Sequence, residues 1–108
     1  MKLLTKAIEK AFIKQGNTED MNPEDVKIIV KFFFPGSCAT WYATEYNPET
    51  EMFFGFVSLF NDYNDALGYF SLNELEFFRS DKQRFLRVER DYYFGEHTLK
   101  EVKDGGRP

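Results

Sequence analysis

Apolar residues recur at the spacing of a helix near the start of the chain. Between residues 3 and 13 they lie three or four positions apart, while lysines recur at every fourth position on another face. This pattern predicts an amphipathic helix over residues 3–13 that buries its apolar side. The lysines of the other face are Lys2, Lys6, Lys10 and Lys14. Gly16 then suits a helix C-terminus, and the polar residues 17–25 are typical of a loop.

From Val26 onward the apolar positions alternate with a period of two, which indicates β-strands. Short turns rich in Pro, Gly and Asn separate the first of these segments, and such connections are typical of an antiparallel meander. Gly55 interrupts the third strand, which indicates either a bulge or a bulky group such as Trp41 lying across the backbone. The predicted strands cover residues 26–34, 38–46, 52–60, 67–70 and 84–91.

A second helix is predicted over residues 72–79. Ser71 and Glu74 have the Ser-x-x-Glu spacing of a capping box, in which each side chain accepts a hydrogen bond from a backbone N–H at the start of the helix. Residues 104–108 are expected to form a frayed tail. The predicted buried side of the second helix consists of Leu72, Leu75 and Phe78.

Together these elements predict a single α+β domain over residues 1–103. An antiparallel sheet of four or five strands carries the N-terminal helix and the second short helix on one apolar face. The strand over 38–46 is expected to place Trp41, Ala43 and Glu45 opposite Tyr42, Thr44 and Tyr46. The expected core residues are Phe32, Phe34, Phe54, Phe56, Phe70, Leu75, Leu86 and Val88.

Charge is distributed unevenly over the 108 residues. Fourteen basic and eighteen acidic residues give a net charge of −4, which disfavours general binding to a phosphate backbone. Between Lys31 and Arg79 the chain has no Lys or Arg. This acidic middle is either a solvated surface or an interaction face for a basic partner. Its carboxylates are Glu45, Glu49, Glu51, Asp62, Asp65, Glu74 and Glu76.

Several kinds of chemistry lack the residues they need. One cysteine excludes an internal disulfide, and one His with one Cys cannot form the usual zinc site. We interpret Cys38 as a small buried residue and His97 as a surface histidine. No phosphate-binding loop is present, and residues 61–65 lack the ligand spacing of a calcium loop. With no long apolar segment and no secretory signal, we expect a cytoplasmic protein without a cofactor.

Five segments occur together in one order and are typical of a known family. They are Val30 to Phe33, Thr40 to Glu45, Phe53 to Gly55, Leu67 to Leu75, and Val88 to Asp91. With the opening Leu3-Leu4-Thr5, they make nearly the whole chain resemble the bacterial domain-of-unknown-function family 2958. The chain departs from that family in a longer acidic loop over 61–65 and in a less Pro-rich stretch over 20–23.

The resemblance implies an accessory protein of plasmids, integrative elements or phages, whose genes often lie near anti-defence genes. We therefore expect a non-enzymatic anti-defence protein, and in particular a CRISPR effector inhibitor. Such an inhibitor binds the basic nucleic-acid channel of an RNA-guided nuclease and blocks guide or target loading. Carboxylates can compete for arginines that normally hold phosphates. The partner is thus expected to be a basic host protein, not a membrane, and the protein itself a monomer or homodimer.

The expected partner-binding residues lie on two successive loops. Because the loops of a meander lie at the periphery of the sheet, we expect their acids to act together. The predicted site consists of Glu45, Glu49, Glu51, Asp62 and Asp65.

Two other functions stay open. Glu89 and Asp91 share a face of the last strand and could serve a small nuclease or another hydrolase as a carboxylate pair. The lysine stripe over residues 2–14 could serve a nucleic-acid-binding accessory protein of plasmid transfer.

Overall fold

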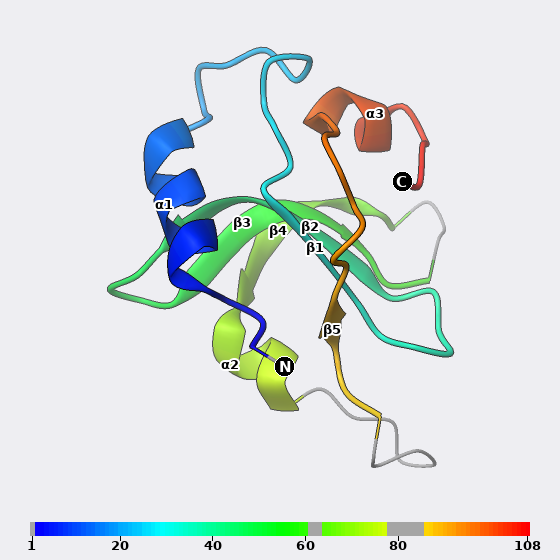
Figure 1. Cartoon of the computed structure of the whole chain (residues 1–108). Coiled ribbons are helices and arrows are strands. Elements are labelled where there is room, and N and C mark those ends of the chain that lie inside the picture. The colour runs from blue at the N-terminus through cyan, green and yellow to red at the C-terminus, as the bar shows by residue number, and fades with distance from the viewer. Residues whose placement is uncertain (1, 61–63, 78–85) are drawn as a thin grey trace.

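The computed structural model describes residues 2–60, 64–77 and 86–108 and contains a five-stranded antiparallel sheet with three helices (Figure 1). The strand order is β4-β3-β2-β1-β5. The chain forms one compact α+β domain, which confirms the predicted fold class. The elements are α1 (Lys6–Gln15), β1 (Val30–Phe33), β2 (Thr40–Asn47), β3 (Met52–Ser58), β4 (Ala66–Ser71), α2 (Leu72–Phe77), β5 (Glu89–Arg90) and α3 (Leu99–Lys103).

Side-chain caps define where the two predicted helices begin. The Thr5 hydroxyl accepts a hydrogen bond from the Ile8 N–H at 3.2 Å, so α1 starts later than predicted, and it ends at Gly16, whose φ is 68°. The Ser71 hydroxyl accepts from the Glu74 N–H at 2.9 Å, as a capping box requires of its first residue. Residues 78 and 79, with the predicted buried Phe78, lie outside the described residues.

The first strand is shorter than predicted because its N-terminal part pairs elsewhere. Residues 26–28 run beside the C-terminal segment, where Lys27 forms an isolated bridge with Thr98 and the Ile28 N–H donates to the His97 carbonyl at 2.9 Å. The last strand is also short. Of the predicted residues 84–91, those numbered 86–88 belong to no strand and 84–85 lie outside the described residues.

A bulge in β2 changes the predicted faces of that strand. Ala43 pairs with Gly55, but Glu45 pairs with Phe54, so Thr44 is an extra residue in β2. Its hydroxyl donates to the Phe54 carbonyl at 3.2 Å. After the bulge the alternation is reversed, and Tyr46 joins the core cluster of Trp41 and Ala43 rather than facing away from it, as the sequence predicted.

Both faces of the sheet are covered, although only one apolar face was predicted. In Figure 1, α2 lies below the sheet and α3 lies above it, next to the C-terminus. The first core lies under α1 and α2; its buried residues are Leu3, Phe12, Val30, Phe32, Phe34, Ala39, Trp41, Ala43, Phe53, Phe70, Leu75 and Val88. The second core lies under α3; its buried residues are Val26, Ile28, Tyr42, Leu99 and Val102.

Phe53, not Phe54, is the core phenylalanine of β3. Phe53 is fully buried, whereas Phe54 and Phe56 are partly exposed on the second face, so the predicted face of this strand is wrong. Adjacent phenylalanines satisfy either choice of face, and the pairing across the bulge decides between them. Leu86, also predicted as core, is partly buried against the first cluster.

Gly55 allows two strands to approach closely. A Cβ built at Gly55 would lie 1.9 Å from the Tyr42 carbonyl oxygen and 2.9 Å from the Ala43 Cα. The obstacle is therefore the backbone of β2 and not the Trp41 ring. The bulge lies on that neighbouring strand, next to Ala43.

The last residues contact the sheet. An Arg107 guanidinium nitrogen donates to the Ser58 hydroxyl at 2.6 Å and another to the Cys38 carbonyl at 3.1 Å. The Lys31 ammonium donates to a backbone oxygen of Pro108 at 3.0 Å. The backbone N–H groups of Asp104, Gly105 and Gly106 donate to carbonyls of α3 as well. The tail predicted to fray thus has defined partners along its whole length. Among the helices described, none is long and apolar enough to cross a membrane.

We expect Phe53→Ala to destabilise the protein much more than Phe54→Ala. Removing the fully buried Phe53 ring should lower the free energy of unfolding by about 3–5 kcal/mol, because the surrounding core cannot close the cavity completely. The partly exposed Phe54 ring should cost about 1–2 kcal/mol. Urea unfolding of both variants measures the difference. A larger loss for Phe54→Ala would show that β3 presents its other face to the core.

Two glycine substitutions test the close approach of β2 and β3. Gly55→Ala should destabilise by about 3 kcal/mol or more, because its Cβ meets rigid backbone. Gly68→Ala is the matched control on β4, where a built Cβ meets nothing within 4 Å, and its effect should stay within about 0.5 kcal/mol. Equal thermal stability of the two variants would contradict the observed packing.

Candidate functional site

A cleft of about 920 Å³ lies over the first core, between the N-terminal residues, α1, α2 and the segment before β5. Its apolar lining continues the core to the surface, because Leu3, Leu75 and Val88 are buried in that cluster. The apolar lining residues are Leu3, Leu4, Leu72, Leu75, Phe77, Leu86 and Val88. The arrangement gives the cleft an apolar floor formed by three separate parts of the chain.

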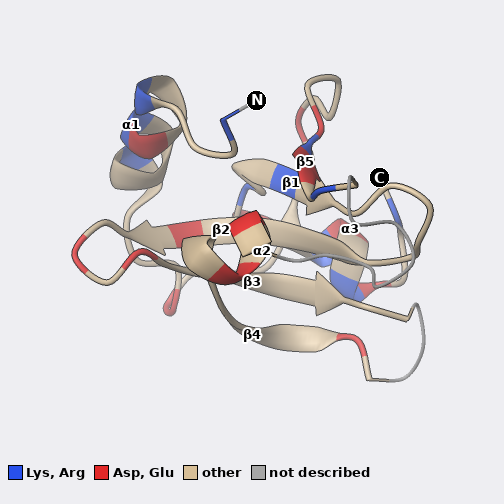
Figure 2. Cartoon of the chain, turned by 90° about the horizontal axis from the view of Figure 1, so that it is seen from below, with Lys and Arg blue, Asp and Glu red and all other residues tan. Residues whose placement is uncertain are grey.

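Among the residues that the structure describes, carboxylates outnumber cations around this cleft. Figure 2 shows acidic residues on α2 and on the β2–β3 turn, with basic residues along α1. The acids that line the cleft are Glu9, Glu51, Glu76 and Glu89, and the cations are Lys2 and Arg87. The negative rim therefore comes from α1, α2, β5 and the β2–β3 turn.

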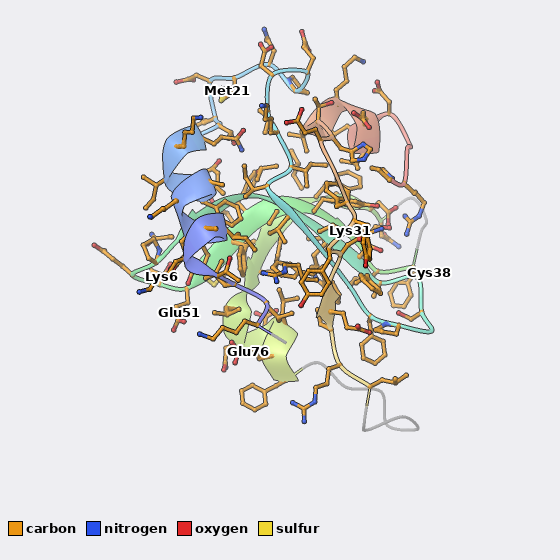
Figure 3. All side chains as sticks on the ribbon, in the orientation of Figure 1. Lys6, Met21, Lys31, Cys38, Glu51 and Glu76 are labelled. Atoms are coloured by element: carbon orange, nitrogen blue, oxygen red, sulfur yellow. The ribbon has the colours of Figure 1, made fainter. Side chains whose placement is uncertain are left out.

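The turn and α2 are connected through Glu51. Its φ of 55° lies in the left-handed region, which few non-glycine residues adopt. Its backbone carbonyl accepts a hydrogen bond from the Leu72 N–H at 3.0 Å. This contact joins the β2–β3 turn to the first residue of α2, and Figure 3 shows Glu51 and Glu76 on the same side of the molecule.

Tyr46 lies at the inner wall of the cleft. Its ring packs against Phe53 and Phe12, with centroid distances of 4.7 and 5.9 Å. Burial raises the pKa of the Tyr46 phenol above its ordinary value of 10.0, and the negative charges of Glu51, Glu9 and Glu76 raise it further. The phenol thus stays neutral at physiological pH and can donate a hydrogen bond to a group in the cleft.

The predicted acids of the second strand and its turn have different surroundings. The Glu45 carboxylate accepts hydrogen bonds from the Thr18 hydroxyl at 2.5 Å and the Thr18 N–H at 3.2 Å, and it is partly buried. It therefore anchors the loop after α1. Glu49 is exposed in the turn, where its N–H donates to the Asn47 side chain at 2.9 Å.

Asp65 lies at the opposite end of the sheet from Glu49 and Glu51. Consecutive turns of a meander alternate between the two ends, and the length of β3 separates them by roughly 20 Å. The structure therefore does not bring the predicted acids together as one surface. Asp62 lies outside the described residues.

The Asp65 carboxylate is also turned inward. One oxygen accepts from the Ser58 hydroxyl at 2.8 Å and lies 3.8 Å from the Arg107 guanidinium. The other oxygen is buried and has no hydrogen-bond partner among the described residues. These contacts are typical of an internal polar network rather than of an exposed charge.

The second acidic pair is likewise divided. The Asp91 carboxylate lies 3.7 Å from the Lys31 ammonium and accepts from the Tyr93 N–H at 2.9 Å, whereas Glu89 lines the cleft. No group of three or more His, Cys, Asp or Glu side chains in the described ranges is arranged to hold a metal ion.

The predictions for the single cysteine and the single histidine concerned their burial. Cys38 is exposed, because the turn before β2 carries it away from the core, so its prediction as buried is wrong (Figure 3). His97 is partly exposed, and its Nδ1 lies 2.8 Å from a Glu101 carboxylate oxygen. This hydrogen bond lowers the pKa of Glu101 below its ordinary value of 4.5.

Sequence reasoning missed most of the cleft. Glu9 and Glu89 are far from the acidic middle of the chain, and only the packing of α1 and β5 around the first core brings them to Glu51 and Glu76. Tyr46 reaches the cleft because of the bulge at Thr44, and no residue in this sequence marks that bulge in advance. Glu76 lay within the acidic stretch but was not included in the predicted site.

The fold and the cleft define a small α+β domain with an acid-rimmed apolar cleft. The family described as "Protein of unknown function (DUF2958)" matches residues 3–102. The chain belongs to this family, as its sequence motifs predicted. No curated protein and no solved structure matches the chain.

The charges around Tyr46 can be measured directly. Glu51→Gln should lower the pKa of the Tyr46 phenol because it removes the largest of the three carboxylate effects, while the effect of burial remains. The ring-carbon chemical shifts of Tyr46 followed by NMR through an alkaline titration give this pKa. Glu49→Gln, which removes the same charge elsewhere in the turn, should change it less. Equal shifts in both variants would contradict the position of Glu51 at the cleft.

Proposed function

We propose that this protein is a non-enzymatic binding protein that holds a basic segment of a host protein in its acid-rimmed cleft. The observation that carries the proposal is the combination of an apolar floor with a rim on which, among the described residues, four carboxylates accompany two cations. A protein segment with apolar side chains flanked by Arg or Lys complements both parts. A nucleic-acid backbone complements neither, because phosphates are repelled by the rim.

The distribution of charge supports a protein partner of opposite sign. The chain has no Lys or Arg between Lys31 and Arg79, and this stretch supplies β2, the turn and α2. Arginine is the preferred partner of a carboxylate in such contacts, since its planar group donates two parallel hydrogen bonds. The neutral Tyr46 phenol offers a further donor inside the cleft.

The first partner to test is a host RNA-guided nuclease, and the anti-defence role is part of this proposal. The channel of such a nuclease presents arginines that normally hold the phosphates of guide and target. Carboxylates on the rim compete for those arginines and block loading. The predicted contact set changes accordingly. Of the five acids that the sequence analysis named, Glu51 lines the cleft, and Glu9, Glu76 and Glu89 join it.

We predict that Glu51→Gln combined with Glu76→Gln slows association with the guide-free nuclease about tenfold, because rim charges steer the encounter. Reversal of both charges to Lys should slow association further. Biolayer interferometry at two salt concentrations measures the rates, and cleavage of target DNA after preincubation measures inhibition.

The matched control is Glu19→Gln combined with Glu24→Gln, which removes two exposed charges from the loop after α1. It should associate at the wild-type rate. If both double variants slowed association equally, the effect would come from net charge and not from the rim of the cleft. Unchanged cleavage in the presence of tightly bound protein would refute the inhibitory role, and fragments produced from guide RNA alone with Mg²⁺ would favour an enzyme instead.

A further inference from the structure

The two edges of the sheet differ in how they are protected. At one edge β5 has two residues, both charged, and Asp91 follows them directly. At the other edge β4 has six residues and pairs only on its inner side, with β3, in the described part of the chain. An unpaired edge presents a row of backbone N–H and C=O groups that can pair with another strand.

Strand β4 lacks the devices that usually prevent such pairing. Its residues Ala66–Ser71 include no charged side chain and no proline, and its register with β3 is regular. At its centre, Gly68 leaves open space, since a Cβ built there meets nothing within 4 Å. As far as the described residues extend, the edge is therefore open to close approach by another backbone.

The outer side chains of β4 are apolar and exposed. Tyr69 is 73% exposed and Leu67 39%, and the Tyr69 ring packs against Phe54 at a centroid distance of 4.9 Å. Leu59 and Phe60, which follow β3, are exposed as well and line a shallow pocket together with Leu67 and Tyr69. Leu67 and Tyr69 lie on the second face, because they pair with Phe56 and Phe54.

We propose that β4 pairs antiparallel with β4 of a second copy of this chain, around a two-fold axis at Gly68. Directly opposite residues of an antiparallel pair place their side chains on the same face of the sheet. In a pair related by a two-fold axis perpendicular to the sheet, this condition is met when one residue lies opposite the same residue of the second copy. With Gly68 on the axis, Leu67 of one copy lies opposite Tyr69 of the other, so exposed apolar side chains cover one another.

Because β4 has no charged residue, a second copy of this chain can pair with it without repulsion. A symmetric pair places each residue near its own kind, so any charge on the pairing strand would meet a like charge. The turn before β3 and α2 carry several carboxylates and would repel their counterparts, whereas β4 carries none. β4 is thus suited to pair with β4 of a second copy.

This inference does not depend on the proposed function. The cleft opens over the first core and its acids lie on other elements, so Glu51→Gln with Glu76→Gln should dimerise as the wild type does. A failure of nuclease binding leaves the dimer proposal unchanged, and a monomeric wild type leaves the cleft proposal unchanged.

Charge complementation at the axis is the test. Sedimentation velocity at micromolar to millimolar concentrations should show a wild-type dimer. Gly68→Lys and Gly68→Glu should each be monomeric, because two like charges then face each other across the axis, and an equimolar mixture should recover a dimer that contains one of each. Asn22→Lys, which adds a charge to an exposed loop, should remain dimeric.

Circular dichroism establishes that the variants fold, and Tyr69→Lys gives a second disruption at a position that is already exposed. A wild-type protein that stays monomeric throughout the concentration range overturns the proposal. So does a dimer that persists in Gly68→Lys and Tyr69→Lys, or a mixture of the two Gly68 variants that stays monomeric.

Discussion

The extra residue Thr44 in β2 is the constraint on which the other contacts depend. It reverses the alternation of side chains in the middle of the sheet, so that Tyr46 and Phe53 join the first core. Thr44 is buried, and its backbone carbonyl accepts a hydrogen bond from the Gln15 side-chain amide at 2.8 Å. The same Gln15 side chain bonds both backbone groups of Lys27. One glutamine thus joins the end of α1, the bulge and the segment that leads into β1.

The position of the cleft follows from this arrangement. Because α1 is held at the bulge, Glu9 lies on the same side of the sheet as Tyr46, and the β2–β3 turn that follows brings Glu51 to meet α2. The resulting acids surround an apolar floor instead of lying apart on the surface. The proposed binding role uses that combination, since an apolar floor contributes affinity and a charged rim directs the approach of a partner.

Periodicity and turn residues predicted the parts of the fold that depend on local sequence. The first helix, the meander and the Ser71 cap were foreseen because each leaves its own pattern. Features that depend on contacts between distant parts of the chain were not predicted. Adjacent phenylalanines at 53 and 54 fit either face, and α3 was missed although Thr98 and Glu101 have the spacing of a cap. Of the candidate site, only Glu51 was predicted, because the other acids of the cleft come from elements that are distant in sequence.

Both the core and the cleft depend on the register of β2 against β3, and NMR measures this register directly through cross-strand contacts between backbone protons. We expect Ala43 to contact Gly55 and Tyr46 to contact Phe53, with Thr44 left without a partner residue on β3. In a regular strand without the bulge, Glu45 would contact Phe53 and Tyr46 would contact Met52. That second set of contacts would turn Tyr46 away from the cleft and contradict both the core and the site described above.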